Sequence, residues 1–499
     1  MYLFIILLLV LFLIFISLFS FKNDNHNWDY LNREFLDNFV DSIFVDKNQL
    51  VYNKNEKTCY VSSIDYLKNN KVTGLSKFGK VEIYYDDIDG HSKLIAFNDK
   101  YYDIINIAVT NLPIVSVRSL DIPKYASFKF NGFVFNNIFR SNSENETVLA
   151  SNVGVQILSN SNLNIKSIAQ MSVRGASSQL FEKKAYKIKF PSDVQLLNNY
   201  KEDTWALDAL FTDKSKIRNK FSSDIWDIIN NNQKINNDLY GDYCELFVDD
   251  EYFGLYLLKN KVNKDITSVT DDGILIKSVA LLREDYVENL LNNKYEVTNG
   301  FFLNYEIKKH SENGFSSIIS MLKDYYTYYY GIVGYDIVYR NYDIDNFINY
   351  KIFVSLIGGS DNITYNQYIS LSNSNSKILT TPWDMDLTWG LNWSDISQLH
   401  SEFYMESSYD TQWMDERIVM NMDEKTLSLM KERYWELRKN VITMDTINGY
   451  LNSYKELLVD SGAAKRDSER WYEYDVEFEI EQIREWAIRR IEFLDEYFK

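Results

Sequence analysis

Three oxygen-bearing side chains, those of Asp361, Asn366 and Asp384, stand at the ends of hydrophobic segments instead of within polar runs. Asp361 follows an apolar stretch that ends in LIGGS, and Asp384 stands in TTPWDMD after another apolar stretch. Magnesium prefers hard oxygen ligands and commonly takes one or two carboxylates together with substrate phosphates. The order of these residues therefore predicts a divalent-metal site contributed by two neighbouring segments.

The five-residue interval between Asp361 and Asn366 also has a catalytic precedent. In the catalytic loop of protein kinases, an Asp accepts the proton of the acceptor hydroxyl, and an Asn at this same spacing binds magnesium. Asp384 can fill the second metal-binding role of such a site. Asp386 would share a strand face with Asp384, so we interpret it as an alternate ligand or a supporting carboxylate. The competing interpretation of the interval is turn formation or helix capping.

A turn of small residues, VRGASSQ at 173–179, lies between two strand-like runs. Such a turn can point backbone N–H groups and hydroxyls at a phosphate, and lysines of the following strand, KKAYKIKF, can reach phosphate oxygens. Small residues also join strands for structural reasons alone, and strand lysines are commonly solvated. The candidates for phosphate contact are Arg174, Gly175, Ser177, Ser178, Lys184, Lys187 and Lys189.

Arg218 begins a helix-like pattern within 213–230, whose apolar residues recur at three- and four-residue steps. Its guanidinium could stabilise charge during a reaction, although structural ion pairing is the favoured interpretation. We keep Arg218 as a supporting candidate beside the metal and phosphate residues.

The elements that must position these groups change in character along the chain. Residues 22–110 contain alternating segments such as KVEIYYDD that predict half-buried strands, without a catalytic pattern. Strand patterns continue through 111–262 around the single helix. From 263 to 499 long helical patterns predominate, and the last of them carries a core-facing apolar stripe. The sequence therefore predicts an α+β chain with a β-rich extension, a β-rich part and a mainly helical part.

Composition excludes several classes of function. The chain has 499 residues, 45% of them hydrophobic, and a net charge of −18, so it can bury a large core but would repel a nucleic-acid backbone. Two cysteines, Cys59 and Cys244, cannot build a zinc cluster or a disulfide framework, and we expect buried thiols in preference to a single bridge. The four histidines show no ligand spacing. The motifs GxxxxGK[ST], GxGxxG, HExxH and GxSxG are absent.

Residues 1–21 contain no charged side chain and reach the roughly 20 residues that a membrane-spanning helix needs. The segment predicts either an export signal or an anchor inserted in the membrane. An uncleaved anchor is favoured because a basic start and a small-residue cleavage site are missing. We therefore expect a membrane-anchored or secreted protein.

An ordered series of motifs resembles the spore coat protein H (CotH) kinase family. It comprises LPIVSV, VRGASS with KKAYKIKF, KSKIRNKF, LFVDDEYFGLYLL, YEIKK, the segment from IDNFINY to SDNITYNQY, and PWDMDLTWG. The likeness covers roughly 111–395, with a weaker tail at IREWAIRRIEFL. Each motif is loose, and their order is what carries the resemblance.

The resemblance implies an atypical two-lobed protein-kinase-like fold, with a β-rich nucleotide-binding lobe at 111–262 and a helical catalytic lobe at 263–499. It also implies ATP with Mg²⁺ or another divalent metal, and an unidentified protein substrate whose Ser or Thr hydroxyls accept phosphate at a cell surface or spore coat. Asp361 is similar to the catalytic acid/base, and Asn366 and Asp384 to the metal ligands. The RGASS turn with Lys184 to Lys189 resembles the phosphate-binding part, and Lys189 is the favoured contact.

One departure from the family pattern concerns Asn260. After GLYLL the family usually carries a Glu, and this chain has Asn260 at that place. The alternative interpretation is therefore a weak or inactive pseudokinase that acts as a surface or coat binding protein. A hydrolase built on Asp361 and Asp384 is a third hypothesis. Glycosylation sequons begin at Asn362 and Asn392, and a glycan at the first would block the predicted base.

Overall fold

The computed structural model describes residues 33–499 apart from 89, 121–150, 160–164, 176, 197–200, 231–240, 280–283, 330, 333 and 392–421. The chain divides into two compact units, residues 1–111 and 112–499. Within the described residues no helix is long and apolar enough to cross a bilayer, and the apolar segment 1–21 lies outside them. Cys59 and Cys244 are both buried free thiols, which confirms that prediction.

The first unit is built on a sheet of nine strands in the order β3-β2-β6-β7-β8-β9-β5-β4, with β1 paired to β9. Ser63 caps the helix α2 (Ile64–Lys68) with its side chain. The β-rich character predicted for this region is confirmed. The strands are β1 (Glu34–Phe35), β2 (Ser42–Val45), β3 (Asn48–Gln49), β4 (Val51–Asn53), β5 (Thr58–Val61), β6 (Val72–Ser76), β7 (Gly79–Ile88), β8 (His91–Phe97) and β9 (Tyr101–Val109).

A closed barrel forms the amino-terminal part of the second unit, in the strand order β10-β11-β12-β13-β14-β16-β15. Side chains alternate between its apolar interior and its outer face, so Tyr186, Ile188 and Leu207 are buried inside while Lys187 and Lys189 point outward. The strands are β10 (Ile114–Ser119), β11 (Ser151–Leu158), β12 (Ile165–Arg174), β13 (Ala185–Val194), β14 (Glu202–Asp208), β15 (Gly241–Val248) and β16 (Glu251–Lys259).

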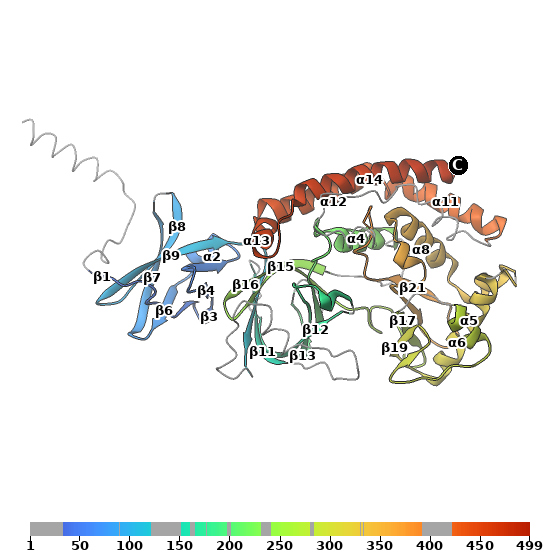
Figure 1. Ribbon diagram of the computed structural model, residues 1–499, viewed down its shortest axis with the longest axis horizontal. Helices are drawn as coiled ribbons and strands as arrows, with labels where there is room; N and C mark the ends of the chain where they lie inside the picture. Colours follow the sequence, from blue (N-terminus) through green and yellow to red (C-terminus); the bar gives the residue numbers. More distant parts are fainter. Residues whose placement is uncertain are drawn as a thin grey trace, which may run out of the picture. The chain divides into compact units, whose positions relative to one another are not determined.

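The rest of the second unit combines a five-stranded sheet with most of the helices. The sheet order is β18-β19-β17-β20-β21, and Figure 1 shows α8 beside β21 and the long α14 alongside α12. The strands are β17 (Ile274–Ser278), β18 (Phe301–Phe302), β19 (Tyr305–Lys309), β20 (Gln367–Leu371) and β21 (Leu379–Pro382). The helices are α4 (Arg218–Asn230), α5 (Glu284–Leu291), α6 (Glu312–Tyr329), α7 (Asp336–Asn341), α8 (Ile344–Ile357), α11 (Glu424–Asn440), α12 (Met444–Lys455), α13 (Ala463–Arg470) and α14 (Val476–Tyr497). A mixed α+β fold, β-rich first and helical later, is thus what the sequence predicted.

Helix α8 is the element that presents the loop of Asp361. Its side chains from Asn346 to Ile357 are all buried, as expected for a helix enclosed by the core. Asp343 caps its start, and Gly358 ends it in the left-handed conformation with φ 65°. A Cβ at Gly358 would lie 2.8 Å from the Trp486 ring of α14, so this turn requires glycine.

Helix α13 packs on the β15–β16 hairpin through buried charges. Asp467 accepts hydrogen bonds from Lys183 Nζ at 2.6 Å and from the Leu255 amide at 2.8 Å, and Lys216 Nζ lies 3.8 Å away. Burial acts to raise the pKa of Asp467, but the charges of Lys183 and Lys216 outweigh burial and lower it. The carboxylate is therefore ionised and accepts from Lys183, while burial lowers the pKa of neighbouring Lys216 to about 7.

Replacing Asp467 with Asn should destabilise the fold strongly. The substitution leaves two buried lysines without their counter-charge, and breaking such a pair typically costs about 3–5 kcal/mol. The measurement is the midpoint of denaturant unfolding. Glu469→Gln on the same helix is the control, because its side chain is 64% exposed and should change stability by less than about 0.5 kcal/mol. Equal midpoints for the two variants would contradict a structural role for Asp467.

Candidate functional site

The two segments that carry the predicted metal ligands are tied together by Asn362. Its side-chain amide donates to the backbone carbonyls of Asn366 at 3.0 Å and Trp383 at 2.9 Å. The Trp383 N–H also donates to the Asn366 carbonyl at 2.9 Å. Asn362 is 1% exposed, and its own carbonyl accepts from the Tyr350 hydroxyl of α8 at 2.7 Å. The loop after α8 and the end of β21 therefore form one connected structure.

Burial of Asn362 also settles one question raised by the sequon at that position. Its amide nitrogen is engaged in two hydrogen bonds inside the protein and is out of reach of solvent. The folded chain therefore cannot carry a glycan on Asn362. The second sequon, at Asn392, lies outside the described residues.

Asn366 and Asp384 share an uncommon backbone conformation. Their φ angles are 48° and 57°, in the left-handed region that Asn and Asp visit more readily than other side chains. Asn366 directly precedes β20, and Asp384 follows β21 by two residues. Residues held in such conformations cluster at ligand-binding sites, where the surrounding structure fixes them. The two predicted ligands are thus held by similar local geometry on adjacent strands.

The segment after Asp384 is anchored to helix α4. Trp389 Nε1 donates to Ser222 Oγ at 2.9 Å, and the Trp389 amide donates to the Ile357 carbonyl at 2.7 Å. Arg218 Nε donates to the Thr388 carbonyl at 3.1 Å, and its Nη1 pairs with Asp213 at 2.5 Å. Arg218 is buried in these interactions, so in this structure it positions the segment and its charge is already compensated.

The charges of the candidate carboxylates Asp361, Asp384 and Asp386 all act on the phenol of Tyr365. The pKa of Tyr365 is raised by burial, then by the charges of Asp384, Asp361 and Asp386. Burial also raises the pKa of Asp386 well above its usual value, followed by the charges of Asp384 and Asp208. Asp361 lies in the short 3₁₀ turn Ser360–Ile363 and is partly exposed. These carboxyl groups therefore act on one another and on Tyr365, and a bound cation would favour their ionised forms.

The oxygen donors of Asp361, Asn366 and Asp384 fit a metal ion only if other ligands complete its coordination. Among the described residues, no group of three or more His, Cys, Asp or Glu side chains is arranged to hold a metal. Two Asp carboxylates and the Asn366 amide are hard oxygen donors, and magnesium sites of this kind are completed by substrate phosphates and water. The residues present therefore fit magnesium bound together with a phosphate ligand.

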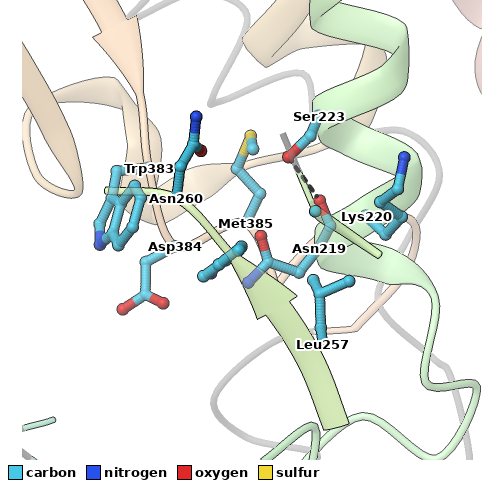
Figure 2. A pocket seen from close by; sticks show the side chains of 10 residues that line it. Asn219, Lys220, Ser223, Leu257, Asn260, Trp383, Asp384 and Met385 are labelled. Atoms are coloured by element: carbon cyan, nitrogen blue, oxygen red, sulfur yellow. Dashed lines mark hydrogen bonds between the residues drawn. The ribbon is translucent and has the colours of Figure 1, made fainter. Parts of the chain in front are cut away.

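A small pocket lies beside Asp384, between α4, the β15–β16 hairpin and the segment Trp383–Met385. Its lining includes Asn260, which stands where the family pattern has Glu and is 1% exposed. Figure 2 shows the Asp384 carboxylate pointing away from the α4 side chains of Asn219 and Ser223. The carboxylate is therefore directed away from the helix that anchors its own segment.

Positive side chains surround the indole of Trp383. Lys259 Nζ lies 4.6 Å from the ring centroid, and Arg174 Cζ and Lys277 Nζ each lie 5.8 Å from it. Trp383 is 3% exposed, and its Nε1–H has no hydrogen-bond partner within the described part of the chain. Cations and an unused donor thus stand directly beside Asp384.

Three further lysines extend this set, which we call the cationic cluster (Arg174, Lys187, Lys259, Lys261, Lys277 and Lys308). Burial, followed by the charges of Arg174, Lys187, Lys308 and Lys277, lowers the pKa of Lys261 to about 7. Burial also lowers the pKa of Lys277, with Asp384 acting in the opposite direction. In a protein of net charge −18, so many converging cations indicate an anion-binding site.

Barrel register explains which strand lysine joins the cluster. Lys187 and Lys259 oppose Ala206 from its two sides, so they stand on one outward-facing row. Lys189 opposes Gln170 and Thr204, two residues further from Arg174, and its side chain is exposed. The cluster therefore includes Lys187, whereas Lys189 lies beyond it.

In the small-residue turn at 173–179, the described polar groups mainly contact other residues of the turn and its immediate neighbours. Gly175 has φ 104°, and a Cβ there would lie 1.8 Å from Ser178 Oγ. Lys184 Nζ donates to the carbonyls of Gln179, at 2.7 Å, and Phe181. The ammonium of Lys184 is thus used in hydrogen bonds to backbone carbonyls next to the turn. The side chain of Ser177 lies outside the described part of the structure.

Sequence reasoning missed Lys259, Lys261, Lys277, Lys308 and Asp208. Lys259 pairs with Asp208 at 2.6 Å, and Asn219 of α4 donates to the same carboxylate at 3.2 Å. Burial acts to raise the pKa of Asp208, but the charges of Lys259 and Arg174 outweigh it and lower the pKa. The available signal was a lysine at or near the end of three apolar strands, in GLYLLKNK, GILIKS and YEIKK.

The second unit is thus a mixed α+β fold in which carboxylates and cations lie close together. The family model described as CotH kinase protein matches residues 171–494, which is more than half of the chain. The chain therefore belongs to the CotH kinase family, and the resemblance found in the sequence is confirmed. No curated protein gives a significant match to the chain.

Removing the two hydrogen bonds that the Asn362 side chain donates should destabilise the protein. Asn362→Ala deletes both donors and leaves the buried Trp383 carbonyl without this partner, which should lower the free energy of unfolding by about 1–3 kcal/mol. Denaturant unfolding measures the loss. Asn375→Ala, in an exposed turn of the same part of the chain, is the control. A loss no larger than that of the control would show that Asn362 does not join the two segments.

Proposed function

We propose that this chain is an ATP-dependent protein kinase that transfers the γ-phosphoryl group to Ser or Thr hydroxyls of a protein. The observation that carries the proposal is the cationic cluster beside Asp384, whose charge acts on Lys277. Asn362 joins the segment of Asp384 to the loop that carries Asp361 and Asn366. Phosphoryl transfer needs phosphates held against positive charge, a metal site and a base at one place. Membership of the CotH kinase family supports the same reaction.

Each role follows from the chemistry of the side chain. Asp361, partly exposed on its turn, orients the acceptor hydroxyl and takes its proton. Asn366 and Asp384 would hold Mg²⁺ or another divalent metal, which when bound supplies charge neutralisation at the phosphates. We assign the phosphates to the cationic cluster in preference to Lys189, because Lys189 is exposed and stands apart from it.

The two parts of the second unit supply opposite sides of this proposed site. Arg174 and Lys259 belong to the barrel, whereas Lys277 and Trp383 belong to the five-stranded sheet and the segment after it. A nucleotide bound between a β-rich lobe and a helical lobe would have this distribution of contacts. We therefore propose a two-lobed kinase-like organisation, with the acceptor a secreted, cell-surface or spore-coat protein, and the apolar segment 1–21 as its signal or membrane anchor.

A pseudokinase is the second candidate, and Asn260 is the observation that favours it. A neutral amide lines the pocket beside Asp384 where the family pattern has a carboxylate. If the missing carboxylate is needed to hold metal, the chain would act as a surface or coat binding protein. Thermal stabilisation by ATP with magnesium, combined with a transfer assay, distinguishes an active kinase, a nucleotide-binding pseudokinase and a scaffold.

Asp361→Asn should abolish transfer while preserving nucleotide binding. Loss of a positioned general base typically lowers the rate by about 10²–10⁴-fold, whereas the proposed phosphate contacts lie on other residues. Phosphate transfer from radiolabelled ATP and thermal shift with ATP and magnesium measure the two properties. Asp345→Asn, an exposed acid on α8, is the control. Full transfer activity in Asp361→Asn would refute the assignment of the base.

Nucleotide affinity should fall as the pH rises through the pKa of Lys261. That pKa is about 7, so the side chain is charged below neutrality and loses its positive charge above it. We expect binding to weaken on the order of tenfold between about pH 6.5 and pH 8.5, since tenfold corresponds to about 1.4 kcal/mol.

The matched variant for this experiment is Lys261→Arg. A guanidinium stays protonated across the range, so the variant should lose most of the pH dependence that is not due to the nucleotide itself. Calorimetric titration in buffers of different ionisation enthalpy would also detect proton uptake by the wild type. Identical pH profiles for the two proteins would show that Lys261 does not face the bound phosphates.

A further inference from the structure

The indole of Trp383 is a hydrogen-bond donor without an acceptor. Its side chain is 3% exposed, and its Nε1–H has no partner within the described residues. Leaving a buried donor unsatisfied costs about 1–3 kcal/mol, so such groups in folded proteins call for an explanation. A ligand that accepts from this N–H would provide one.

Unpartnered indoles alone do not identify a site in this protein. Trp226 and Trp486 also have Nε1–H groups without an acceptor in the described part of the chain. Trp226 is fully buried among aromatic rings, with Phe353 at 5.1 Å and Tyr350 at 5.8 Å between centroids. No described cation lies over either indole, whereas three cations lie within 6 Å of the Trp383 ring.

The charges beside Trp383 select the chemical class of the ligand. Lys259 already pairs with Asp208, and Asp384 is the carboxylate that acts on Lys277 most strongly. Arg174 and Lys277 nevertheless repel each other, and Lys261 adds a further charge to the group. Glu306 pairs with Lys308 and also acts on Lys277. The cluster still holds more cations than the carboxylates of Asp208, Asp384 and Glu306 that act on them, and together with the donor N–H it forms a site for a multiply charged anion.

The indole is held in place before any ligand arrives. Its backbone is fixed by Asn366 and Asn362, and the Tyr368 ring packs edge-on at 5.8 Å. In Figure 2 the ring nitrogen of Trp383 lies on the same side as the Asp384 carboxylate, away from α4. A donor that is already oriented loses little entropy on binding.

We infer that Trp383 is a phosphate-binding residue: its Nε1–H donates to a phosphoryl oxygen of the bound nucleotide, while its ring keeps Arg174, Lys259 and Lys277 beside the same phosphate group. The inference rests on the proposed function for the choice of a nucleotide. The group recognised is a polyphosphate anion. ATP contains it as its triphosphate chain, and inorganic tripolyphosphate presents it without the nucleoside.

Trp383→Phe tests the inference, with Trp226→Phe as its matched control. Both substitutions keep an aromatic ring and remove an unpartnered N–H, but only the first removes one surrounded by cations. Calorimetric titration of the full chain with ATP plus magnesium, and separately with tripolyphosphate, should show about tenfold weaker binding for Trp383→Phe. Trp226→Phe should bind both ligands as the wild type does.

A direct readout is the indole N–H resonance of Trp383 in the ¹⁵N-tryptophan-labelled wild type, assigned by its absence from Trp383→Phe. We expect it to move downfield when either ligand is added. If Trp383→Phe fails to fold, the Trp383 indole resonance can be assigned in the wild-type protein with a paramagnetic divalent ion. Such an ion broadens the resonance nearest Asp384.

The outcomes separate this inference from the proposed function. If the wild type binds ATP but the Trp383 resonance does not move and Trp383→Phe binds normally, the inference is overturned and the kinase proposal stands. If tripolyphosphate binds and shifts the resonance while ATP does not bind, the phosphate contact stands and the nucleotide assignment fails. Absence of binding by both ligands to the wild type would overturn both.

Discussion

The amide of Asn362 makes the interaction on which the whole candidate site depends. One side chain joins the loop after α8 to the end of β21 by donating to a carbonyl of each. Both carbonyls belong to residues next to, or within, the proposed metal and phosphate contacts. The geometry of Asn366, Trp383 and Asp384 is therefore set by a buried hydrogen-bonded unit inside the helical core, and not by flexible loops on the surface.

The protein is negatively charged overall, but the charge at the cationic cluster is positive. The chain carries −18, yet the cationic cluster concentrates positive side chains where the barrel meets the five-stranded sheet. A polyanion would be repelled by the surface in general and attracted at this place, so the cluster favours binding there over binding elsewhere. The lowered pKa of Lys261 shows that the cluster carries an electrostatic cost that an anion would relieve.

The parts of the site that the sequence predicted are those encoded by short intervals. The spacing and residue types of Asp361, Asn366 and Asp384 made them candidates, and their roles stay predictions. The structure does join the segments of Asn366 and Asp384 through Asn362. The cationic cluster could not be found in this way, because its members come from β12, β13, β17 and β19 and from the end of β16. Alternation along β13 put Lys187 and Lys189 on one face, and only pairing with β12 and β14 distinguishes them.

Asn362 shows what a sequon leaves open. The sequence analysis noted that a glycan there would block the predicted base, and the structure buries the side chain, whose amide donates two hydrogen bonds inside the protein. A pattern of three residues describes what an enzyme outside the protein could recognise. It does not report whether the folded chain leaves that asparagine exposed.

The replacement of the family Glu by Asn260 is less damaging to the proposed reaction than the sequence alone suggested. Protein kinases require a lysine held by a carboxylate so that the lysine meets the phosphates in a fixed position. On the adjacent strand β14, Asp208 pairs with Lys259 at 2.6 Å and accepts a hydrogen bond from Asn219, so under the proposed function we assign this carboxylate the part of orienting the lysine. A Glu at 260 would add negative charge beside Asp208, Asp384 and Asp386, where burial and mutual repulsion already raise the pKa of Asp386. The neutral amide therefore preserves the positive character of the cluster, while the lysine keeps the partner that orients it.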